Sequence, residues 1–178
     1  MSDVDLKGLI RTVPDHPRPG IQFRDVTTLL QDAEGLRAAV EGLSVPYLDA
    51  GVRHVAAIEA RGFILGGAIA TRVGAGFVPV RKRGKLPYAT VGLDYELEYG
   101  VDRVEMHQDS VTRGDRVLLV DDLIATGGTA LAALGLIEAL GGHVVGVAAI
   151  IDLPDLGGSA RIRDRGYDVH TLCSFEGD

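Results

Sequence analysis

Two adjacent carboxylates, followed by a turn of small and hydroxyl-bearing residues, form the stretch of this sequence best suited to chemistry. The stretch runs from Val117 to Ala130 and reads VLLVDDLIATGGTA. Its first four residues are apolar and rich in valine, which predicts a short buried strand with Asp121 and Asp122 at its end. An apolar run after the turn predicts a helix that reaches Leu140. The turn itself consists of Ala125, Thr126, Gly127, Gly128 and Thr129.

A strand, a turn of this composition and the start of a helix together form a site for an anion. The backbone N–H groups of such a turn point outward, its threonine hydroxyls add donors, and the helix dipole favours negative charge. Asp121 and Asp122 cannot serve the same anion, but carboxylates suit vicinal hydroxyls or a hydrated Mg²⁺. A site that holds a phosphate beside sugar hydroxyls is a site for ribose 5-phosphate.

A simpler interpretation of these residues remains open. An acidic pair after a strand can be a polar strand end with a helix cap, and a Gly-Gly turn can be only a turn. The complete string favours the site. It is neither a Walker loop, which would end in Gly-Lys-Ser/Thr, nor a G-x-G-x-x-G dinucleotide loop.

Short apolar runs alternate with helical patterns along the chain, as a parallel sheet requires. Residues 55–58 and 77–80 predict strands on either side of a helix that begins near Arg61. Residues 144–151 and 169–172 predict two later strands. We therefore expect an α/β fold with a central, mostly parallel sheet flanked by helices.

Three further helices are predicted outside this alternation. Residues 3–11 have apolar side chains at helical spacing, and residues 154–165 have the composition of a helix. Asp32 is suited to cap a helix that continues to Leu43. Between residues 3–11 and the helix capped by Asp32, the Pro- and Gly-rich residues 14–30 predict an extended, turning segment.

A β-hairpin is predicted within residues 84–107. Apolar or aromatic residues alternate with acidic ones from Val91 to Tyr99, and the alternation resumes at Val104 and Met106 after a turn near Gly100. This pattern indicates an antiparallel hairpin inserted between the parallel strands, which is suited to act as a flap.

The composition predicts one globular domain, residues 1–178. Apolar content of 46% is enough for a core, and the net charge of −7 argues against nucleic-acid or anionic-membrane binding. A single cysteine, Cys173, allows no internal disulfide, and no Cys/His cluster has zinc spacing. With no hydrophobic signal region and no run long enough to span a bilayer, we expect a cytoplasmic protein.

Four cations fall within five residues from Arg81 to Lys85, in an otherwise acidic chain. Such a cluster can be a solvated basic turn. It can equally be a clamp for a polyphosphate, since cations close to phosphate gain from charge complementarity. The pattern leaves both interpretations open.

The chain resembles the adenine phosphoribosyltransferase family over nearly its whole length. The segments that carry the resemblance are PRPGIQFRDVTTLL, IEARGF, VRKRGKLP, YELEYG and VLLVDDLIATGGTA. The resemblance implies a type I phosphoribosyltransferase fold and a homodimer. It also implies formation of AMP and diphosphate from adenine and 5-phosphoribosyl 1-diphosphate, with Mg²⁺ held mainly by the substrate diphosphate and no dedicated protein metal site.

The resemblance also implies roles for individual residues. The residues from Ala125 to Thr129 would hold the 5′-phosphate, and Asp121 and Asp122 the ribose hydroxyls. Residues implied at the diphosphate, where the family has a non-prolyl cis peptide and shares cations partly across the dimer interface, are Ala60, Arg61, Arg81, Lys82 and Lys85.

Adenine recognition would use the N-terminal arm, residues 1–31. By the same resemblance, Phe23 and Leu123 would sandwich the base, while main-chain groups near Gln22 and Arg24 read its edge. The residues implied in catalysis are Arg61 and, on the flap, Glu98 and Tyr99, with Glu98 as the proton-transfer group. By pattern alone, Glu98 is a solvated carboxylate.

Three other functions remain as alternatives. The chain could transfer the phosphoribosyl group to another base, because residue physics alone excludes none. It could sense phosphoribosyl diphosphate without catalysis, although the acidic charge and single domain disfavour a regulator that binds DNA. A phosphoacceptor signalling domain built on the acidic pair would leave the T-G-G-T turn unexplained.

Overall fold

The computed structural model describes residues 4–96 and 100–177, and its main feature is a seven-stranded sheet. The strands are β1 (Arg11–Pro14), β2 (Gln22–Asp25), β3 (His54–Ile58), β4 (Gly76–Lys82), β5 (Thr90–Glu96), β6 (Val101–His107), β7 (Arg116–Ile124), β8 (His143–Asp152) and β9 (Val169–Ser174). The helices are α1 (Thr27–Gln31), α2 (Ala33–Ser44), α3 (Arg61–Val73), α4 (Gly128–Ala139) and α5 (Gly158–Asp164), with 3-10 turns η1 (Val45–Tyr47) and η2 (Pro154–Leu156).

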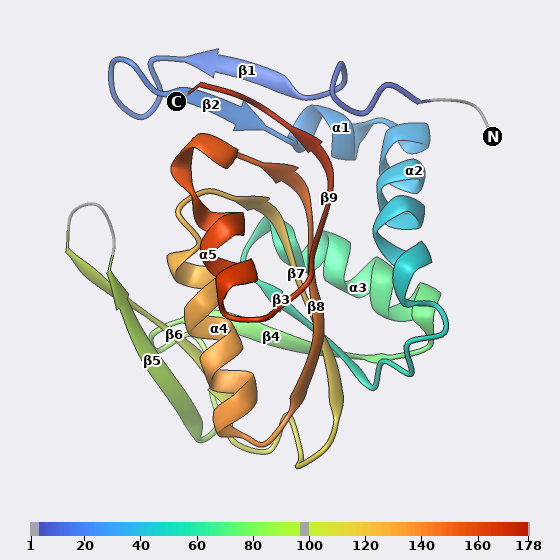
Figure 1. Ribbon diagram of the computed structural model, residues 1–178, viewed down its shortest axis with the longest axis vertical. Helices are drawn as coiled ribbons and strands as arrows, with labels where there is room; N and C mark the ends of the chain where they lie inside the picture. The colour runs from blue at the N-terminus through green and yellow to red at the C-terminus, as the bar shows by residue number, and fades with distance from the viewer. Residues whose placement is uncertain (1–3, 97–99, 178) are drawn as a thin grey trace.

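The order of the main sheet is β5-β6-β4-β3-β7-β8-β9, and β4, β3, β7, β8 and β9 pair in parallel. The hairpin β5–β6 is antiparallel and joins the edge of the sheet through pairing of β6 with β4 (Figure 1). The predicted fold class, a mostly parallel sheet with an inserted hairpin, is therefore confirmed.

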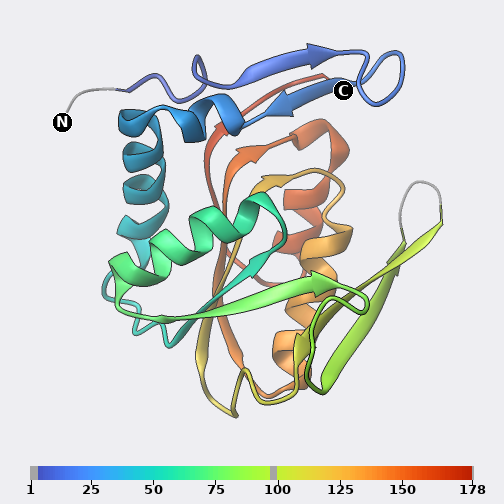
Figure 2. The ribbon, with the colours of Figure 1, turned by 180° about the vertical axis from the view of Figure 1, so that it is seen from behind.

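Helices cover both faces of the sheet because its central strands are apolar on both sides. Along β7, Val117 and Leu119 belong to the core beneath α4, whereas Leu118 and Val120 belong to the core beneath α2 and α3. This follows from the two-residue period of a strand. Each fully buried side chain of this size contributes about 1.5–3 kcal/mol. Figure 1 looks onto α4 and α5, and Figure 2 onto α2 and α3.

The helix predicted after Asp32 is confirmed. The carboxylate of Asp32 accepts a hydrogen bond from the N–H of Gly35 at 2.7 Å, which caps α2. The helix ends at Ser44, and Pro46 falls in the 3-10 turn that follows it.

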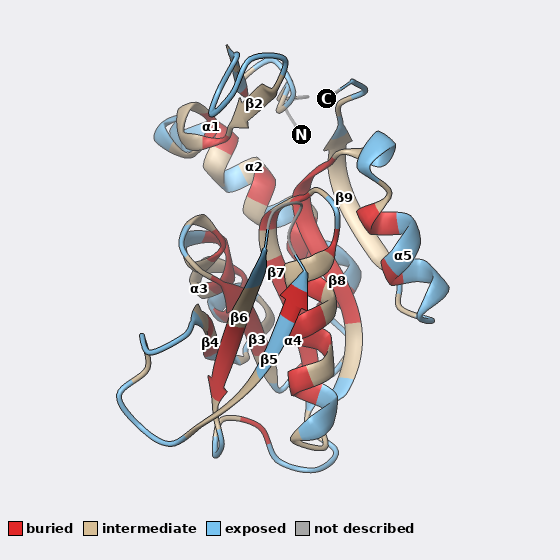
Figure 3. Ribbon diagram, turned by 90° about the vertical axis from the view of Figure 1, so that its left-hand side faces the viewer, coloured by how far each residue is buried: buried red, intermediate tan, exposed pale blue. Residues whose placement is uncertain are grey.

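The helix predicted for residues 3–11 is wrong in the part that the structure describes. Residues 6–9 form turns. The carboxylate of Asp5 accepts from the N–H of Gly8 at 3.0 Å, and the N–H of Arg11 donates to the hydroxyl of Thr28 at 3.2 Å. Bonds to side chains thus compete with helical bonds, and the chain enters β1. Strands β1 and β2 form a separate two-stranded sheet, which Figure 3 shows apart from the buried core of the main sheet.

The helix predicted for residues 154–165 is divided in two. Gly157, with φ of 74°, ends the 3-10 turn η2 and precedes α5. A left-handed residue cannot continue a right-handed helix, and glycine adopts that conformation without steric cost.

No helix in the part of the chain that the structure describes is long and apolar enough to cross a membrane.

Candidate active site

The acidic pair lies inside strand β7, whereas the sequence predicted it at the end of the strand. On one side, pairing of β7 with β3 ends at Val120. On the other side, pairing with β8 continues through Asp121 to Ile124. The two carboxylates are therefore held by a paired strand, but they lie beyond the end of β3, where the carboxyl edge of a parallel sheet opens.

Arg61, the first residue of α3, lies against this acidic pair. Its Nε donates to Oδ2 of Asp122 at 2.5 Å, and the Asp122 side chain is 9% exposed. Oδ1 of Asp121 accepts from the N–H of Asp122 at 2.9 Å. The first turn of α3 can approach this closely because residue 62 is glycine: a Cβ there would lie 2.9 Å from Oδ1 of Asp121.

Charge repulsion within the pair is only partly offset by Arg61. Removal from water and the adjacent charge of Asp122 raise the pKa of Asp121 well above its usual range, while Arg61 acts in the opposite direction. A ligand that brings hydroxyl donors or a cation to Asp121 would relieve this cost. The site is thus suited to a sugar diol or a hydrated metal ion.

A cavity of about 320 Å³, here called the acidic cavity, opens over these carboxylates. It is lined by Ile58, Glu59, Ala60, Arg61, Lys82, Tyr95, Asp121, Asp122 and Thr129. The hairpin contributes Tyr95, which is 8% exposed. The peptide bond between Glu59 and Ala60 is cis.

The turn after β7, residues Ala125–Thr129 (the β7–α4 turn), encloses a second cavity of about 100 Å³, the turn cavity. Asp121 and Thr129 line both cavities, so the two adjoin. Gly127, with φ of 80°, precedes α4, which begins at Gly128. A helix start leaves backbone N–H groups without helical partners, and these are available to an anion.

The N-terminal arm reaches the acidic cavity through Arg61. The guanidinium of Arg61 lies 5.6 Å from the centre of the Phe23 ring on β2. Gln22 and Arg24 flank Phe23 on the same strand, and within the described parts of the chain β2 pairs with β1 alone. Half of the main-chain groups of β2 therefore face away from β1. Leu123, the other predicted base contact, lines the turn cavity.

Asp25 fixes β2 to the rest of the arm. Hydrogen bonds from Thr27 and Arg11 lower the pKa of Asp25 to about 2. A carboxylate with a depressed folded-state pKa stabilises the fold above its unfolded pKa, and this contribution is lost as the pH falls through about 2. We expect Asp25→Asn to lower the free energy of unfolding by about 1 kcal/mol at pH 7, after allowance for solvent screening.

The measurement is urea unfolding of wild type and Asp25→Asn at pH 7 and at pH 2.5. The difference between the two proteins should shrink at the lower pH. Asp109→Asn, at an exposed position, is the control, and it should change the free energy of unfolding little at either pH. A difference of equal size at both pH values would contradict the assigned bonds.

The basic cluster is divided between the cavity and its surroundings. Lys82 lines the acidic cavity, and its ammonium group pairs with Asp102 of the hairpin, which raises the pKa of Lys82. The guanidinium of Arg81 donates to Oε2 of Glu59 and to the carbonyl of Lys85, both at 3.0 Å. Arg81 and Lys85 are absent from the described lining of the acidic cavity.

Glu98 and Tyr99, the residues implied in catalysis on the flap, lie outside the described residues. The last described residue before them, Glu96, brings β5 to the β7–α4 turn: a Cβ on Gly128 would lie 3.1 Å from the carbonyl oxygen of Glu96. The hairpin therefore approaches the turn at Glu96.

Comparison with known proteins connects this geometry to a family. The family described as "Phosphoribosyl transferase domain" matches residues 27–174. The adenine phosphoribosyltransferase of Methylobacillus flagellatus is 60% identical over 173 residues, which cover 97% of this chain and 98% of that protein. The chain belongs to the adenine phosphoribosyltransferase family. It is therefore a glycosyltransferase of purine salvage, as the sequence predicted.

Solved structures of adenine phosphoribosyltransferases have the same fold. That from Rhodothermus marinus matches with a TM-score of 0.88 and 53% identity, over 96% of each chain. That from Giardia lamblia, complexed with 9-deazaadenine, matches with a TM-score of 0.92 and 34% identity, over 98% of each chain.

Two groups at this adenine phosphoribosyltransferase site were not predicted from the sequence. Glu59 accepts from the N–H of Lys82 at 2.6 Å and pairs with Arg81, so it orders the basic cluster. Burial alone would raise the pKa of Glu59, but these bonds lower it. Tyr95 was assigned only to the apolar side of the hairpin, yet its hydroxyl lies 3.5 Å from Nζ of Lys82. Its place as the first residue of EARGF could have indicated Glu59, whereas no local pattern indicates the Tyr95 contact.

Proposed function

We propose that this enzyme transfers the 5-phosphoribosyl group of 5-phosphoribosyl 1-diphosphate to N9 of adenine, releasing diphosphate. The observation that carries the proposal is the junction of the acidic cavity with the turn cavity at Asp121 and Thr129. Carboxylates for a sugar diol thus adjoin a turn suited to a phosphate. Arg61 connects this junction to Phe23 on the N-terminal arm.

The chain's own residues would stabilise the separation of charge in the reaction. As the C1′–oxygen bond to diphosphate breaks, the sugar becomes positive at C1′ and the leaving group gains negative charge. Arg61 and Lys82 line the cavity where that charge would develop, and Ala60 lines the same cavity. Preorganised cations and N–H donors lower such a barrier.

Asp121 and Asp122 would orient the ribose by accepting hydrogen bonds from its hydroxyls. Water is the competing nucleophile at C1′, and the hairpin is placed to exclude it, because Tyr95 already forms part of the cavity wall. Formation of the N9–C1′ bond requires that the purine lose its N9 proton, and Glu98 is proposed as the group that transfers that proton.

The site fits a magnesium ion that is shared with the substrate. Among the described residues, no group of three or more His, Cys, Asp or Glu side chains could hold a metal. Two adjacent carboxylates are available, and hydrated Mg²⁺ commonly uses one or two carboxylates with substrate phosphates. When bound, the ion would neutralise charge on the diphosphate. We therefore propose Mg²⁺ as a substrate-bound cofactor.

The proposed specificity for adenine rests on the N-terminal arm and on the relatives. The Giardia lamblia relative is complexed with 9-deazaadenine. In this chain the unpaired edge of β2 offers main-chain donors and acceptors beside Phe23. Such groups can read the edge of a base, and the ring can stack on its face.

The test is diphosphate release after mixing phosphoribosyl diphosphate and Mg²⁺ with adenine, hypoxanthine, guanine, xanthine and a pyrimidine in turn. We expect release with adenine only. Preference for another base would replace the adenine assignment and leave the transferase reaction intact. Binding of phosphoribosyl diphosphate with no release for any base would favour the sensor alternative.

Removal of the Phe23 ring should weaken adenine binding selectively. We expect Phe23→Ala to cost about 1–2 kcal/mol of adenine affinity through lost stacking and burial. Phe77→Ala is the control, because Phe77 is a second phenylalanine ring, 40% exposed, that lies on β4 and packs on Phe63. Calorimetric titration with adenine measures both, and equal affinities for the two variants would contradict the base pocket.

Lys85 tests the proposed homodimer together with the diphosphate clamp. Because Lys85 lies outside the described lining of its own acidic cavity, it would act on the diphosphate in the partner's site. We expect Lys85→Ala to raise the KM for phosphoribosyl diphosphate and leave that for adenine unchanged. Steady-state kinetics with sedimentation analysis provide the measurement. A monomer in solution, or equal small effects on both KM values, would support the solvated-turn interpretation.

A cytoplasmic location is part of the proposal, since the single cysteine forms no internal disulfide.

A further inference from the structure

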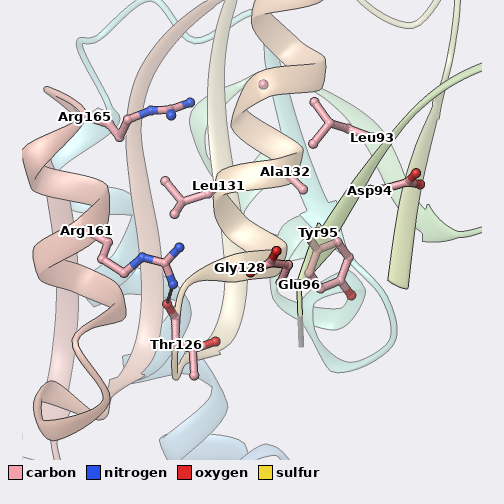
Figure 4. A pocket seen from close by; sticks show the side chains of 11 residues that line it. Leu93, Asp94, Tyr95, Glu96, Thr126, Gly128, Leu131, Ala132, Arg161 and Arg165 are labelled. Carbon is pink, nitrogen blue, oxygen red and sulfur yellow. Dashed lines mark hydrogen bonds between the residues drawn. The ribbon is translucent and has the colours of Figure 1, made fainter. Parts of the chain in front are cut away.

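Helix α5 lies directly behind the β7–α4 turn and bonds to two consecutive carbonyl groups of it. The N–H of Gly158 donates to the carbonyl oxygen of Ala125 at 3.0 Å. The guanidinium of Arg161 donates to the carbonyl oxygen of Thr126 at 2.8 Å. Figure 4 shows Arg161 reaching from α5 to Thr126 across the base of a larger cleft, whose volume is about 520 Å³.

These two hydrogen bonds fix the orientation of two peptide groups. They therefore also determine the direction in which the N–H of each group points. In a trans peptide the C=O and N–H point in opposite directions. With the carbonyls of Ala125 and Thr126 held toward α5, the N–H groups of Thr126 and Gly127 point away from it. That is the direction needed to face an anion in the turn cavity, whose described lining contains no α5 residue.

Helix α5 is held at its start by close backbone packing and a buried hydrogen bond, so it can serve as a support. A Cβ on Gly158 would lie 2.2 Å from the carbonyl oxygen of Ala125 and 2.6 Å from the nitrogen of Gly127, so only glycine allows this backbone contact. The next residue, Ser159, is buried and donates to Oδ2 of the buried Asp152 at 2.8 Å. This bond joins the start of α5 to the end of β8.

We propose that Arg161, assisted by Gly158, is a positioning residue for the 5′-phosphate: it holds the β7–α4 turn with its N–H groups directed at the phosphate. The inference rests on the proposed function. A turn that is already ordered loses less entropy when the phosphate binds, and its donors need no reorganisation during the reaction. Arg161 itself does not contact substrate. An exposed arginine on a short helix therefore contributes to nucleotide affinity through the backbone of another element.

The experiment measures affinities for AMP and for adenine in Arg161→Ala, Arg161→Lys and Arg163→Ala. Arg163 is the matched control, because it lies on the same helix and its guanidinium is 3.4 Å from the carbonyl of Val169, away from the turn. We expect Arg161→Ala to bind AMP on the order of tenfold more weakly, with adenine affinity unchanged. Arg161→Lys should recover part of the loss, since an ammonium group can also donate to a carbonyl. Arg163→Ala should match wild type.

Backbone NMR order parameters without ligand supply a second, independent readout, because they report how ordered an N–H vector is even when it has no hydrogen-bond partner. Arg161→Ala and Gly158→Ala should both lower the order parameters of Thr126 and Gly127, and Arg163→Ala should not. Unchanged order parameters, unchanged AMP affinity, or equal loss of AMP and adenine affinity in Arg161→Ala would each overturn the inference. Wild type that fails to bind AMP would refute the proposed function instead, and the order parameters would still decide whether Arg161 orders the turn.

Discussion

Replacement of Glu98 by Gln is expected to lower kcat by about 10²–10⁴-fold, the usual cost of losing a general acid–base group. Substrate affinities should change little, because Gln keeps the size and polarity of Glu. Adenine N9–H is acidic only well above neutral pH, so transfer needs a group that accepts or relays this proton. A carboxylate in a closed, dry site would have its pKa raised toward a useful range.

The control for Glu98 is Glu96→Gln, two residues earlier on the same hairpin. Glu96 is exposed at the end of β5, and its carboxylate makes no contact on which the proposal depends. Steady-state kinetics of both variants, with adenine and phosphoribosyl diphosphate varied separately, should show a kcat effect for Glu98 alone. Similar behaviour of the two variants would mean that Glu98 is a solvated residue and that water handles the proton.

Arg61→Ala should have the second largest effect, because Arg61 contacts three parts of the site. It pairs with Asp122, lies over Phe23 and lines the acidic cavity. Loss of one partner from a largely buried charge pair costs about 2–3 kcal/mol when the removed partner is partly exposed, as Arg61 is. That cost corresponds to a decrease of roughly 30- to 150-fold in kcat/KM for phosphoribosyl diphosphate.

Arg61→Lys distinguishes geometry from charge. Lysine keeps the positive charge but lacks the planar fork that places Nε on Asp122 and the guanidinium over Phe23, so most of the loss should remain. Arg72→Ala is the matched control, because Arg72 lies near the other end of α3 in an exposed pair with Glu41. A full recovery with lysine, or a comparable loss in Arg72→Ala, would contradict the role given to Arg61.

The parallel sheet could be predicted because its signals are local. The runs that became β3, β7 and β8 are short, apolar and bounded by polar residues, so their length and composition distinguish them from helices. The start of α2 was equally clear, since Asp32 is a capping residue at the right distance from an apolar face. The two carboxylates and the small-residue turn could be predicted as a site for the same reason.

The misjudged segments depend on contacts between distant parts of the chain. Residues 6–9 form turns because Thr28 draws the backbone of Arg11 into β1, a bond between residues 17 positions apart. Helix α5 begins after Gly157 because Gly158 must contact the β7–α4 turn, more than 30 positions earlier. The pair of Arg61 with Asp122 spans 61 positions. The periodicity of apolar residues carries no information about such pairs, so they are seen only in the folded structure.

The central claim is that ribose 5-phosphate lies where the acidic cavity meets the turn cavity, and a crystal structure of the enzyme with AMP tests it most directly. We expect the phosphate within hydrogen-bonding distance of the N–H groups of the β7–α4 turn, the ribose hydroxyls at Asp121 and Asp122, and adenine beside Phe23. A phosphate bound instead in the larger cleft, by Arg161 and Arg165, with the acidic pair free of the ribose, would contradict the claim.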